Sequence, residues 1–323
     1  YDYNQITIEG STALTYDDDA GQRFQAYGWH VQSVDGHDRV AVADAIRQAQ
    51  AESGRPSIII CRTHIAYGSP NKQDTAASHG EPLGVDEVRL TKEALGWPVD
   101  AEFFVPDQAL ARFREALSRG AEAQGRWDAL FARYEEVYPD LAGEWKRRMA
   151  GELPGGWEEF LPHFAPEDGP IATRAAGGKI MAAIAPALPE LVGGSADLHP
   201  STKTYLSAYP AVKKGEYAAR NLHFGIREHA MAGILNGMAL HGGFRPYGST
   251  FLVFSDYMRP SVRLATFMKL RIIYVYTHDS VFVGEDGPTH QPVEHAASLR
   301  IIPGLTVIRP ADANETTAAW RAT

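Results

Sequence analysis

The sequence predicts an α/β protein whose parallel sheets are flanked by helices. Short runs of β-branched and aromatic residues, such as 57–61 and 272–276, are typical of buried strands. Helical patterns alternate with these runs, and alternating strands and helices form parallel sheets. The chain has 323 residues, which is enough for two domains of ordinary size.

In the first third of the chain, a helical pattern over residues 40–51 precedes the strand pattern of 57–61. Residues 68–84 are rich in Gly, Pro, Ser and His, which predicts a functional loop. From Asp107 to about Met149 the pattern is helical, charged and rich in alanine. We interpret that stretch as packing and covering surface without chemistry of its own.

Clusters of Pro and Gly in residues 153–170 indicate a linker, and a second α/β block begins near Ile171. Its predicted helices are 171–187, 228–241 and one that ends at Met268, and its predicted strands are 190–193, 221–224, 244–247 and 272–276. The chain starts at Tyr1 without a methionine and stops inside a helical pattern that begins at Ala313. We therefore expect an internal segment of a longer protein.

The composition is typical of a soluble globular protein, with 44% hydrophobic and 22% charged residues. The formal net charge is -9 and no cluster of Lys and Arg stands out, which argues against a nucleic-acid surface. No apolar stretch approaches the roughly 20 residues of a membrane span, and no signal peptide is visible. The single cysteine fits a reducing compartment, so we expect a cytoplasmic protein.

The run 284–294, Gly-Glu-Asp-Gly-Pro-Thr-His-Gln-Pro-Val-Glu, follows the predicted strand 272–276. Ligands of open α/β sheets bind just beyond the carboxyl ends of strands. Asp286 and His290 are therefore well placed to hold a polar substrate and to move its protons.

Glu228 starts a predicted helix directly after a strand. An isolated acid in this position is usually one that the helix dipole favours. Here the helix is unusually rich in small residues, which let a second helix approach closely, as at a symmetric subunit contact. Farther on, Phe251, Phe254 and Tyr257 recur every three residues and share one helical face, a pattern that most often belongs to a core.

Other candidates are uninformative alone. His79 lies in the loop 68–84, and Asn4 lies near a strand end. Taken one at a time, Arg174 is typical of a solvated arginine, Ser201 of a serine in a turn and His278 of a histidine at a strand end. Arg is, however, suited to forked contacts with phosphate.

Taken together, the loop 284–294, the segment Arg227-Glu228-His229 and the run Ser78-His79-Gly80-Glu81-Pro82-Leu83-Gly84 resemble transketolases, and the resemblance covers essentially the whole chain. It implies two thiamine-diphosphate-binding-type domains, each a parallel sheet flanked by helices, joined by a helical linker region. Residues 1–100 would be the C-terminal part of the diphosphate-binding domain, 101–170 the helical extension and linker, and 171–323 a truncated pyrimidine-binding domain.

The resemblance also implies thiamine diphosphate with Mg²⁺ or Ca²⁺. Glu228 would share a proton with the ring nitrogen N1′ of the coenzyme and so turn its amine into a base; burial among apolar groups favours the protonated form of such a carboxyl. The further cofactor contacts would be Phe251, Phe254 and Tyr257 around the aminopyrimidine, Ile65 against the thiazolium, His79 near the diphosphate, and Asp197 near the cofactor and the subunit contact.

The implied metal ligands are the Asn4 side chain and the Ile6 carbonyl, which suit hard oxygen-binding cations. The Gly-Asp-Gly triplet that precedes this Asn in the family is absent from the sequence. Ala76 stands where many relatives carry another His.

The implied reaction moves a two-carbon ketol unit from a ketose phosphate to an aldose phosphate, as in the pentose phosphate pathway of carbohydrate metabolism. Asp286 would hold the donor's C2 hydroxyl, and His290 and His79 would assist proton transfer. Arg174, Ser201 and His278 would hold the phosphate end. The family implies a homodimer with active sites at the subunit interface.

Three alternatives remain. Dihydroxyacetone synthase has nearly the same motifs. Deoxyxylulose-phosphate synthase shares Asp-Gly-x-Thr-His-Gln but fits less well, because here the run continues as Pro292-Val293-Glu294 and follows Thr277-His278-Asp279-Ser280. A noncatalytic dimerising fragment is the alternative from a different class.

Overall fold

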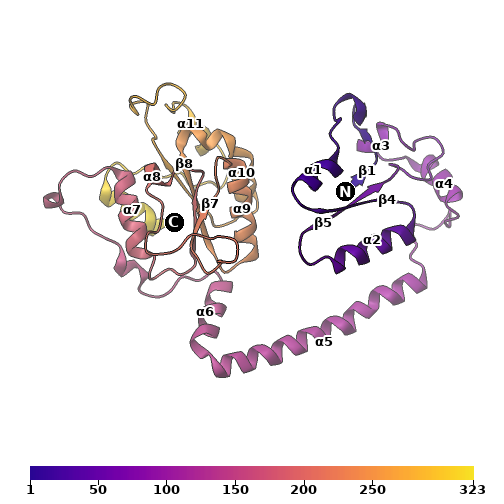
Figure 1. Cartoon of the computed structure of the whole chain (residues 1–323), viewed down its shortest axis with the longest axis horizontal. Helices are drawn as coiled ribbons and strands as arrows, with labels where there is room; N and C mark the ends of the chain where they lie inside the picture. The colour runs from indigo at the N-terminus through magenta and orange to yellow at the C-terminus, as the bar shows by residue number, and fades with distance from the viewer. The chain divides into compact units, whose positions relative to one another are not determined.

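The computed structural model describes residues 1–323 and divides into two compact units, Tyr1–Gly120 and Ala121–Thr323. Each unit holds a parallel sheet with helices against it, so the predicted α/β class is confirmed (Figure 1). The two units are described separately below.

The sheet of the first unit has the order β1-β5-β4, and all its pairs are parallel. Its strands are β1 (Asp2–Tyr3), β4 (His30–Asp35) and β5 (Ser57–Arg62). A separate antiparallel pair, which the sequence pattern did not predict, joins β2 (Ile6–Thr7) and β3 (Gly10–Ser11).

Helices α1 (Ala20–Ala26) and α2 (Arg39–Ala51) lie against opposite faces of that sheet (Figure 1). A Cβ on Gly21 of α1 would lie 3.8 Å from the side chain of Val31, whereas the next residue of β4, Gln32, donates to the carbonyl of Ala45 in α2. Successive strand residues point to opposite faces, so the two helices do as well. The predicted helix 40–51 and strand 57–61 are thus confirmed.

The first unit continues with two further helices, α3 (Ala77–Gly80) and α4 (Val85–Ala94). The helical stretch predicted from Asp107 to Met149 is present as α5 (Asp107–Val137) and α6 (Pro139–Met149). The break falls at a proline in the first turn of α6, where its missing N–H costs nothing. Two 3₁₀ turns follow, η2 (Trp157–Phe160) and η3 (Pro166–Asp168).

The sheet of the second unit has the order β7-β6-β8-β9, and all its pairs are parallel. Its strands are β6 (Leu191–Ser195), β7 (Asn221–His223), β8 (Arg245–Phe251) and β9 (Ile273–Thr277). Close approach of strands explains Gly194 in β6, because a Cβ there would lie 1.8 Å from the Leu222 carbonyl oxygen.

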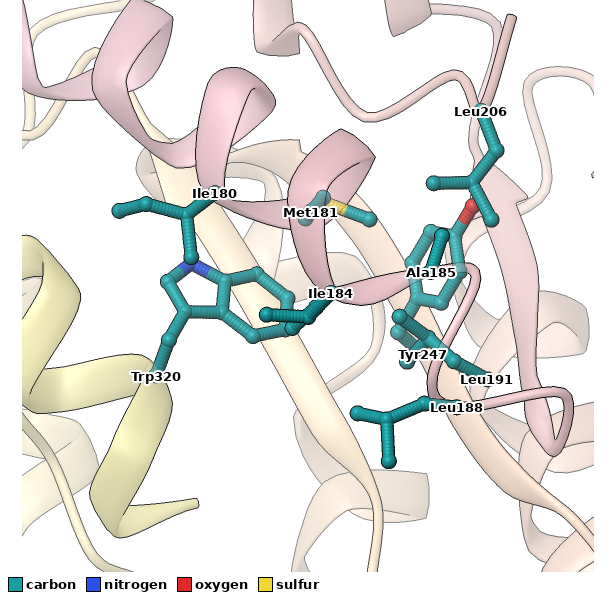
Figure 2. Close-up of a cluster of buried hydrophobic side chains, with 9 residues drawn as sticks. All are labelled: Ile180, Met181, Ile184, Ala185, Leu188, Leu191, Leu206, Tyr247 and Trp320. Carbon is teal, nitrogen blue, oxygen red and sulfur yellow. The ribbon is translucent and has the colours of Figure 1, made fainter. Parts of the chain in front are cut away.

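Helices α7 (Thr173–Ile184) and α12 (Ala313–Ala322) cover one face of this sheet. Figure 2 shows Trp320 of α12 meeting the α7 side chains, which continue into a cluster with Leu191 and Tyr247 of the strands. Helices α9 (Glu228–His241) and α10 (Arg259–Phe267) pack with the other face around Met231, Leu235 and Val262. Two short helices remain, α8 (His199–Thr202) and α11 (His295–Arg300).

One predicted element is wrong in part. Instead of a strand at 244–247 and a helix up to Met268, β8 runs on to Phe251, a 3₁₀ helix η4 (Leu252–Tyr257) follows, and α10 starts only at Arg259. Pro260 explains the late start, because a proline fits only the first turn of an α-helix. None of the helices is both long and apolar enough to cross a membrane.

Candidate active site

The predicted site residues of the second unit gather at the carboxyl edge of its sheet. Asp197 and Ser201 follow β6, Glu228 follows β7, Phe251 ends β8 and His278 follows β9. Because parallel strands end at the same edge, residues that are far apart in the sequence are brought together.

Three residues are predicted to hold the phosphate end of the substrate and are here called the phosphate clamp: Arg174, Ser201 and His278. Arg174 contacts the other two. Its guanidinium donates to Nε2 of His278 at 3.1 Å and lies 3.5 Å from the carbonyl oxygen of Ser201. Since Nε2 accepts, the His278 proton lies on Nδ1, which is 2.9 Å from the Thr277 hydroxyl. Arg174, Ser201 and His278 therefore form one connected group, and their shared role in holding a phosphate stays a prediction.

His278 is held in an unusual conformation and environment. Its φ of 53° is left-handed, and its ring stacks on Phe251 with centroids 3.7 Å apart. Burial lowers the pKa of His278, Arg174 lowers it further, and Asp286 opposes the shift. The imidazole is thus neutral at pH 7, which preserves Nε2 as an acceptor for Arg174.

The aromatic stripe predicted on one helical face is present, but Phe251 is the last residue of β8, and Phe254 and Tyr257 lie in the 3₁₀ helix η4 rather than in an α-helix. Phe251 and Phe254 stack with centroids 5.9 Å apart, and so do Phe254 and Tyr257. Residues three apart eclipse in a 3₁₀ helix, so the spacing gave the correct shared face. Phe251 is buried, whereas Tyr257 is 65% exposed and lies at the open end of the stripe.

The loop 284–294 brings His290 to that stripe. The ring of His290 meets Phe254 edge-on, with centroids 5.2 Å apart, and lies 6.1 Å from that of Phe251. Gly284 and Gly287 adopt φ of 92° and 78°, values that a side chain rarely permits. Asp286 is exposed and makes no hydrogen bond within the chain, although its charge acts on His278.

Glu228 is the first residue of α9 and is only 7% exposed. Its carboxylate makes no hydrogen bond or ion pair within the chain, and its oxygens are not among the buried side-chain atoms that lack a partner, so they are open to a ligand. Such an unpaired acid fits one that is completed by a ligand. Asp197 has a left-handed φ of 62°, is exposed and makes no such contact either.

A largely apolar groove of about 480 Å³ is lined by β9, at the free edge of the sheet, and by residues 305–310. Arg174, His278 and Ser280 line it beside the carboxyl end of β9. Arg174 and His278 therefore face open space, while the rest of the groove is lined by residues of α7, β9, α12 and the segment 305–310.

In the first unit, the predicted metal ligands Asn4 and Ile6 are near each other in one tight turn. Oδ1 of Asn4 accepts from the Ile6 N–H at 2.9 Å, and Gln5 between them has a φ of 65°. Side-chain and carbonyl oxygens suit Mg²⁺ or Ca²⁺. These two residues fit such an ion as part of an oxygen shell, the other ligands of which must come from elsewhere.

His79 and Ile65 lie in the loops that follow β5. His79 is exposed in the single turn of α3, and Ser78 beside it donates to the Lys72 carbonyl at 2.7 Å. Ile65 is half-buried, and its carbonyl accepts from the Asp74 N–H at 3.1 Å. No hydrogen bond or ring contact joins His79 to Asn4, Ile6 or Ile65, so the structure does not connect these predicted residues.

Sequence reasoning missed a polar cluster at this edge. His64 pairs with Asp74, its backbone N–H donates to Nε2 of His37 at 3.0 Å, and His37 stacks on Tyr67 with centroids 3.9 Å apart. Its signal in the sequence was slight: a His three residues past the predicted strand 57–61, and another in the run Asp-Gly-His-Asp at the end of the preceding strand.

Both units thus present polar side chains at the carboxyl edge of a parallel sheet, which is the architecture of cofactor-binding α/β proteins. Residues 1–154 match the family model "Transketolase, thiamine diphosphate binding domain", and residues 169–323 match "Transketolase, pyrimidine binding domain". The chain belongs to the transketolase family.

Similar proteins support this membership. The chain is 49% identical over 323 residues to a transketolase of Geobacillus stearothermophilus and 50% identical over 331 residues to one of Mycobacterium leprae. The matches cover 99% of this chain but only 48% and 47% of those relatives, so the chain spans about half the length of the curated relatives it matches.

Solved structures agree. A transketolase from Leishmania mexicana superposes with a TM-score of 0.95 at 41% identity, covering 100% of this chain and 48% of that one. A transketolase from Pichia stipitis in complex with sedoheptulose-7-phosphate superposes with a TM-score of 0.93 at 39% identity, covering 99% of this chain and 48% of that one.

Proposed function

We propose that the complete gene product containing these residues is a transketolase, which transfers a two-carbon ketol unit reversibly from a ketose phosphate to an aldose phosphate. The observation that carries the proposal is the group at the carboxyl edge of the second sheet, where Arg174, Ser201 and His278 lie beside the aromatic stripe and His290. The transketolase names of the similar proteins support the same reaction class.

Thiamine diphosphate, when bound, supplies the carbanion and the electron sink for carbon–carbon cleavage. The buried and unpaired Glu228 would hold a proton at ring nitrogen N1′. Phe251, Phe254 and Tyr257 would pack against the ring and exclude water from that contact. Asp197, Ile65 and His79 are proposed further cofactor contacts, and Asn4 and Ile6 would supply two oxygens to Mg²⁺ or Ca²⁺.

Sugar phosphates are the proposed substrates, because relatives from Pichia stipitis were solved with sedoheptulose-7-phosphate and fructose-6-phosphate. Arg174, Ser201 and His278 would hold the phosphate and so orient the sugar. Asp286 would hold a donor hydroxyl, and His290 and His79 would donate and accept protons at the substrate oxygens. Carbohydrate metabolism through the pentose phosphate pathway is the proposed setting.

A homodimer is the proposed assembly, with active sites at the subunit interface. The outer face of α9 supports it: Gly233, Ile234, Gly237 and Leu240 are exposed along one side of the helix. Small residues beside exposed aliphatic ones are suited to close contact with a second helix. The cytoplasm is the proposed location, which the single cysteine fits.

The deciding experiment joins cofactor binding to turnover. We would titrate the complete gene product with thiamine diphosphate and Mg²⁺ by calorimetry, and assay ketol transfer from a ketose phosphate to an aldose phosphate, in wild type and Glu228→Gln. Wild type should bind and turn over, whereas Glu228→Gln should lose turnover by about a thousandfold, within the range of general acid–base catalysis. His241→Gln, at the exposed end of the same helix, is the matched control.

Four outcomes would contradict the proposal in different ways. No cofactor binding by wild type would remove the cofactor assignment. Binding without ketol transfer would favour the noncatalytic, dimerising alternative. Transfer to formaldehyde in preference to aldose phosphates, or condensation of pyruvate with a triose phosphate, would favour dihydroxyacetone synthase or deoxyxylulose-phosphate synthase respectively.

A further inference from the structure

The pair His64–Asp74 lies at the carboxyl edge of the first unit's sheet, one residue beyond Thr63, which follows β5. Nδ1 of His64 is 2.7 Å from Oδ2 of Asp74. An ionised carboxylate only accepts hydrogen bonds, so the imidazole proton lies on Nδ1. Nε2 makes no hydrogen bond within the chain, and the two side chains are 38% and 37% exposed, so a ligand can reach them.

Asp74 is held in place by a closed loop. Its N–H donates to the carbonyl of Ile65 at 3.1 Å, and Gly68 donates to the side chain of Gln73 at 3.0 Å. This closure requires Asp74 to adopt a left-handed φ of 56°. Asp tolerates that region better than most residues, yet strained backbone of this kind clusters at functional sites.

The second carboxylate oxygen of Asp74 lacks a partner. Oδ1 is buried and accepts no hydrogen bond, while Oδ2 is engaged by His64. An unsatisfied buried acceptor is costly.

The His64 backbone is held from the neighbouring strand. Its N–H donates to Nε2 of His37, which follows β4, and the two rings stack with centroids 5.7 Å apart. His37 in turn stacks on Tyr67. The imidazole is therefore fixed on one side by Asp74 and on the other by packing, which is how a preorganised proton-transferring group is built.

We propose that His64 is a further acid–base residue for the sugar substrate, with Asp74 as the positioning residue that fixes its tautomer and balances its charge. This inference rests on the proposed ketol transfer. As the donor's carbon–carbon bond breaks, a hydroxyl proton moves to Nε2, the O–H electron pair becomes the new C=O bond, and the carbon–carbon pair stays with the two-carbon unit. The proton returns from Nε2 to the acceptor's carbonyl oxygen when the new bond forms, so no proton is consumed.

The competing explanation is that the His64–Asp74 pair only holds the loop in its conformation, a role called here a loop clamp. The following variants distinguish a loop clamp from an acid–base pair. Asp74→Asn keeps the shape, an acceptor oxygen and tolerance of left-handed backbone, but it removes the balancing charge. Asp74→Gly relieves the backbone conformation and removes the carboxylate. His64→Gln keeps a polar side chain without an imidazole. His30→Gln is the matched control, because His30 contacts Ser57 at 3.1 Å at the opposite end of the same two strands.

The test measures kcat and KM for ketol transfer in the complete gene product, thiamine diphosphate affinity by calorimetry, and the His64 tautomer by ¹⁵N-resolved imidazole NMR. We expect Nδ1–H in wild type. We expect Asp74→Asn, Asp74→Gly and His64→Gln to lose kcat about a hundredfold, with cofactor affinity and thermal stability within about twofold and a few degrees of the His30→Gln control.

Wild-type kcat in His64→Gln and Asp74→Asn would overturn the inference and leave the proposed function standing. The same holds if Asp74→Asn is fully active while Asp74→Gly and His64→Gln lose cofactor affinity and stability together, because that pattern is a loop clamp. If wild type transfers no ketol unit, the proposed function fails and this inference fails with it.

Discussion

The second unit builds its site on three clusters of buried hydrophobic side chains, whereas Ala45 is the one fully buried hydrophobic residue of the first unit. The first unit instead holds its loops by polar contacts. Glu87 accepts from Ser69 and twice from Asn71, and Asp74 holds His64. Packing fixes whole elements, while hydrogen bonds fix single side chains, so the two units should respond to different substitutions.

The same contrast appears in the site residues. In the second unit, Arg174, His278, Phe251 and His290 form one connected group, because four parallel strands end beside one another. In the first unit, β1 has two residues, and the predicted residues Asn4 and His79 have only local contacts. Within this chain, the second sheet thus gathers its predicted site residues by topology, whereas the predicted residues of the first unit lie in loops.

The largest effect is expected from the packed cluster. Ile180→Ala removes a side chain with 0% exposure, so it should cost about 3 kcal/mol in the free energy of unfolding. Ile59→Ala in half-buried β5 should cost less than half as much. Urea unfolding followed by circular dichroism measures the free energy of unfolding of both variants. Equal losses of that free energy would contradict the expected difference between the units.

Next in size is the loss of turnover when the loop 284–294 is changed. Asp286→Ala and His290→Ala should each lower kcat by about a hundredfold, because general acid–base and hydroxyl contacts are removed. The fold should be retained, since Asp286 is exposed and His290 meets the stripe only edge-on. Glu285→Ala, next to Asp286 and also exposed, is the control. If the complete gene product with Asp286→Ala or His290→Ala has the kinetics of wild type, the loop has no part in the mechanism.

A smaller effect is expected at the phosphate clamp. Arg174→Lys replaces a planar fork by a point charge, so KM for a phosphorylated donor should rise about tenfold with kcat nearly unchanged. An unphosphorylated ketose should show no such rise. Arg321→Lys, in a surface pair with Glu158, is the control. An equal rise for both donors would mean that Arg174 supports the fold of the edge and does not bind phosphate.

Most helices and strands of the second unit followed from the sequence, and α9 begins at Glu228 as the pattern predicted. In the first unit the pattern predicted α2 and β5, whereas β4, α1 and α4 were not predicted. The 3₁₀ turn at Leu252–Tyr257 could not be predicted, since its three-residue aromatic spacing also fits an α-helix. The His64–Asp74 pair was beyond reach for another reason. It depends on a loop closure and a left-handed φ at Asp74, and neither leaves a periodic pattern in the sequence.

The smallest effect concerns the hydrogen bonds that Glu87 accepts from Ser69 and Asn71 in the first unit. The stability that these bonds contribute depends on pH. Hydrogen bonds from Ser69, then from the side chain and N–H of Asn71, hold the pKa of Glu87 below its ordinary value of 4.5. Because the folded pKa is the lower one, the unfolded chain binds more protons on acidification. The stabilisation is therefore fully present above about pH 4.5 and is lost as the pH falls through the folded pKa.

Glu87→Gln should accordingly destabilise the first unit at pH 7 and flatten the acid side of its stability profile. The difference from wild type should shrink steadily below pH 4.5. Urea unfolding at several pH values measures this, with Glu93→Gln as the control, since Glu93 pairs with Arg89 on the exposed face of the same helix. A difference that stays constant with pH would mean that Glu87 acts through shape alone, and that hydrogen bonds to its charged form do not hold the loop.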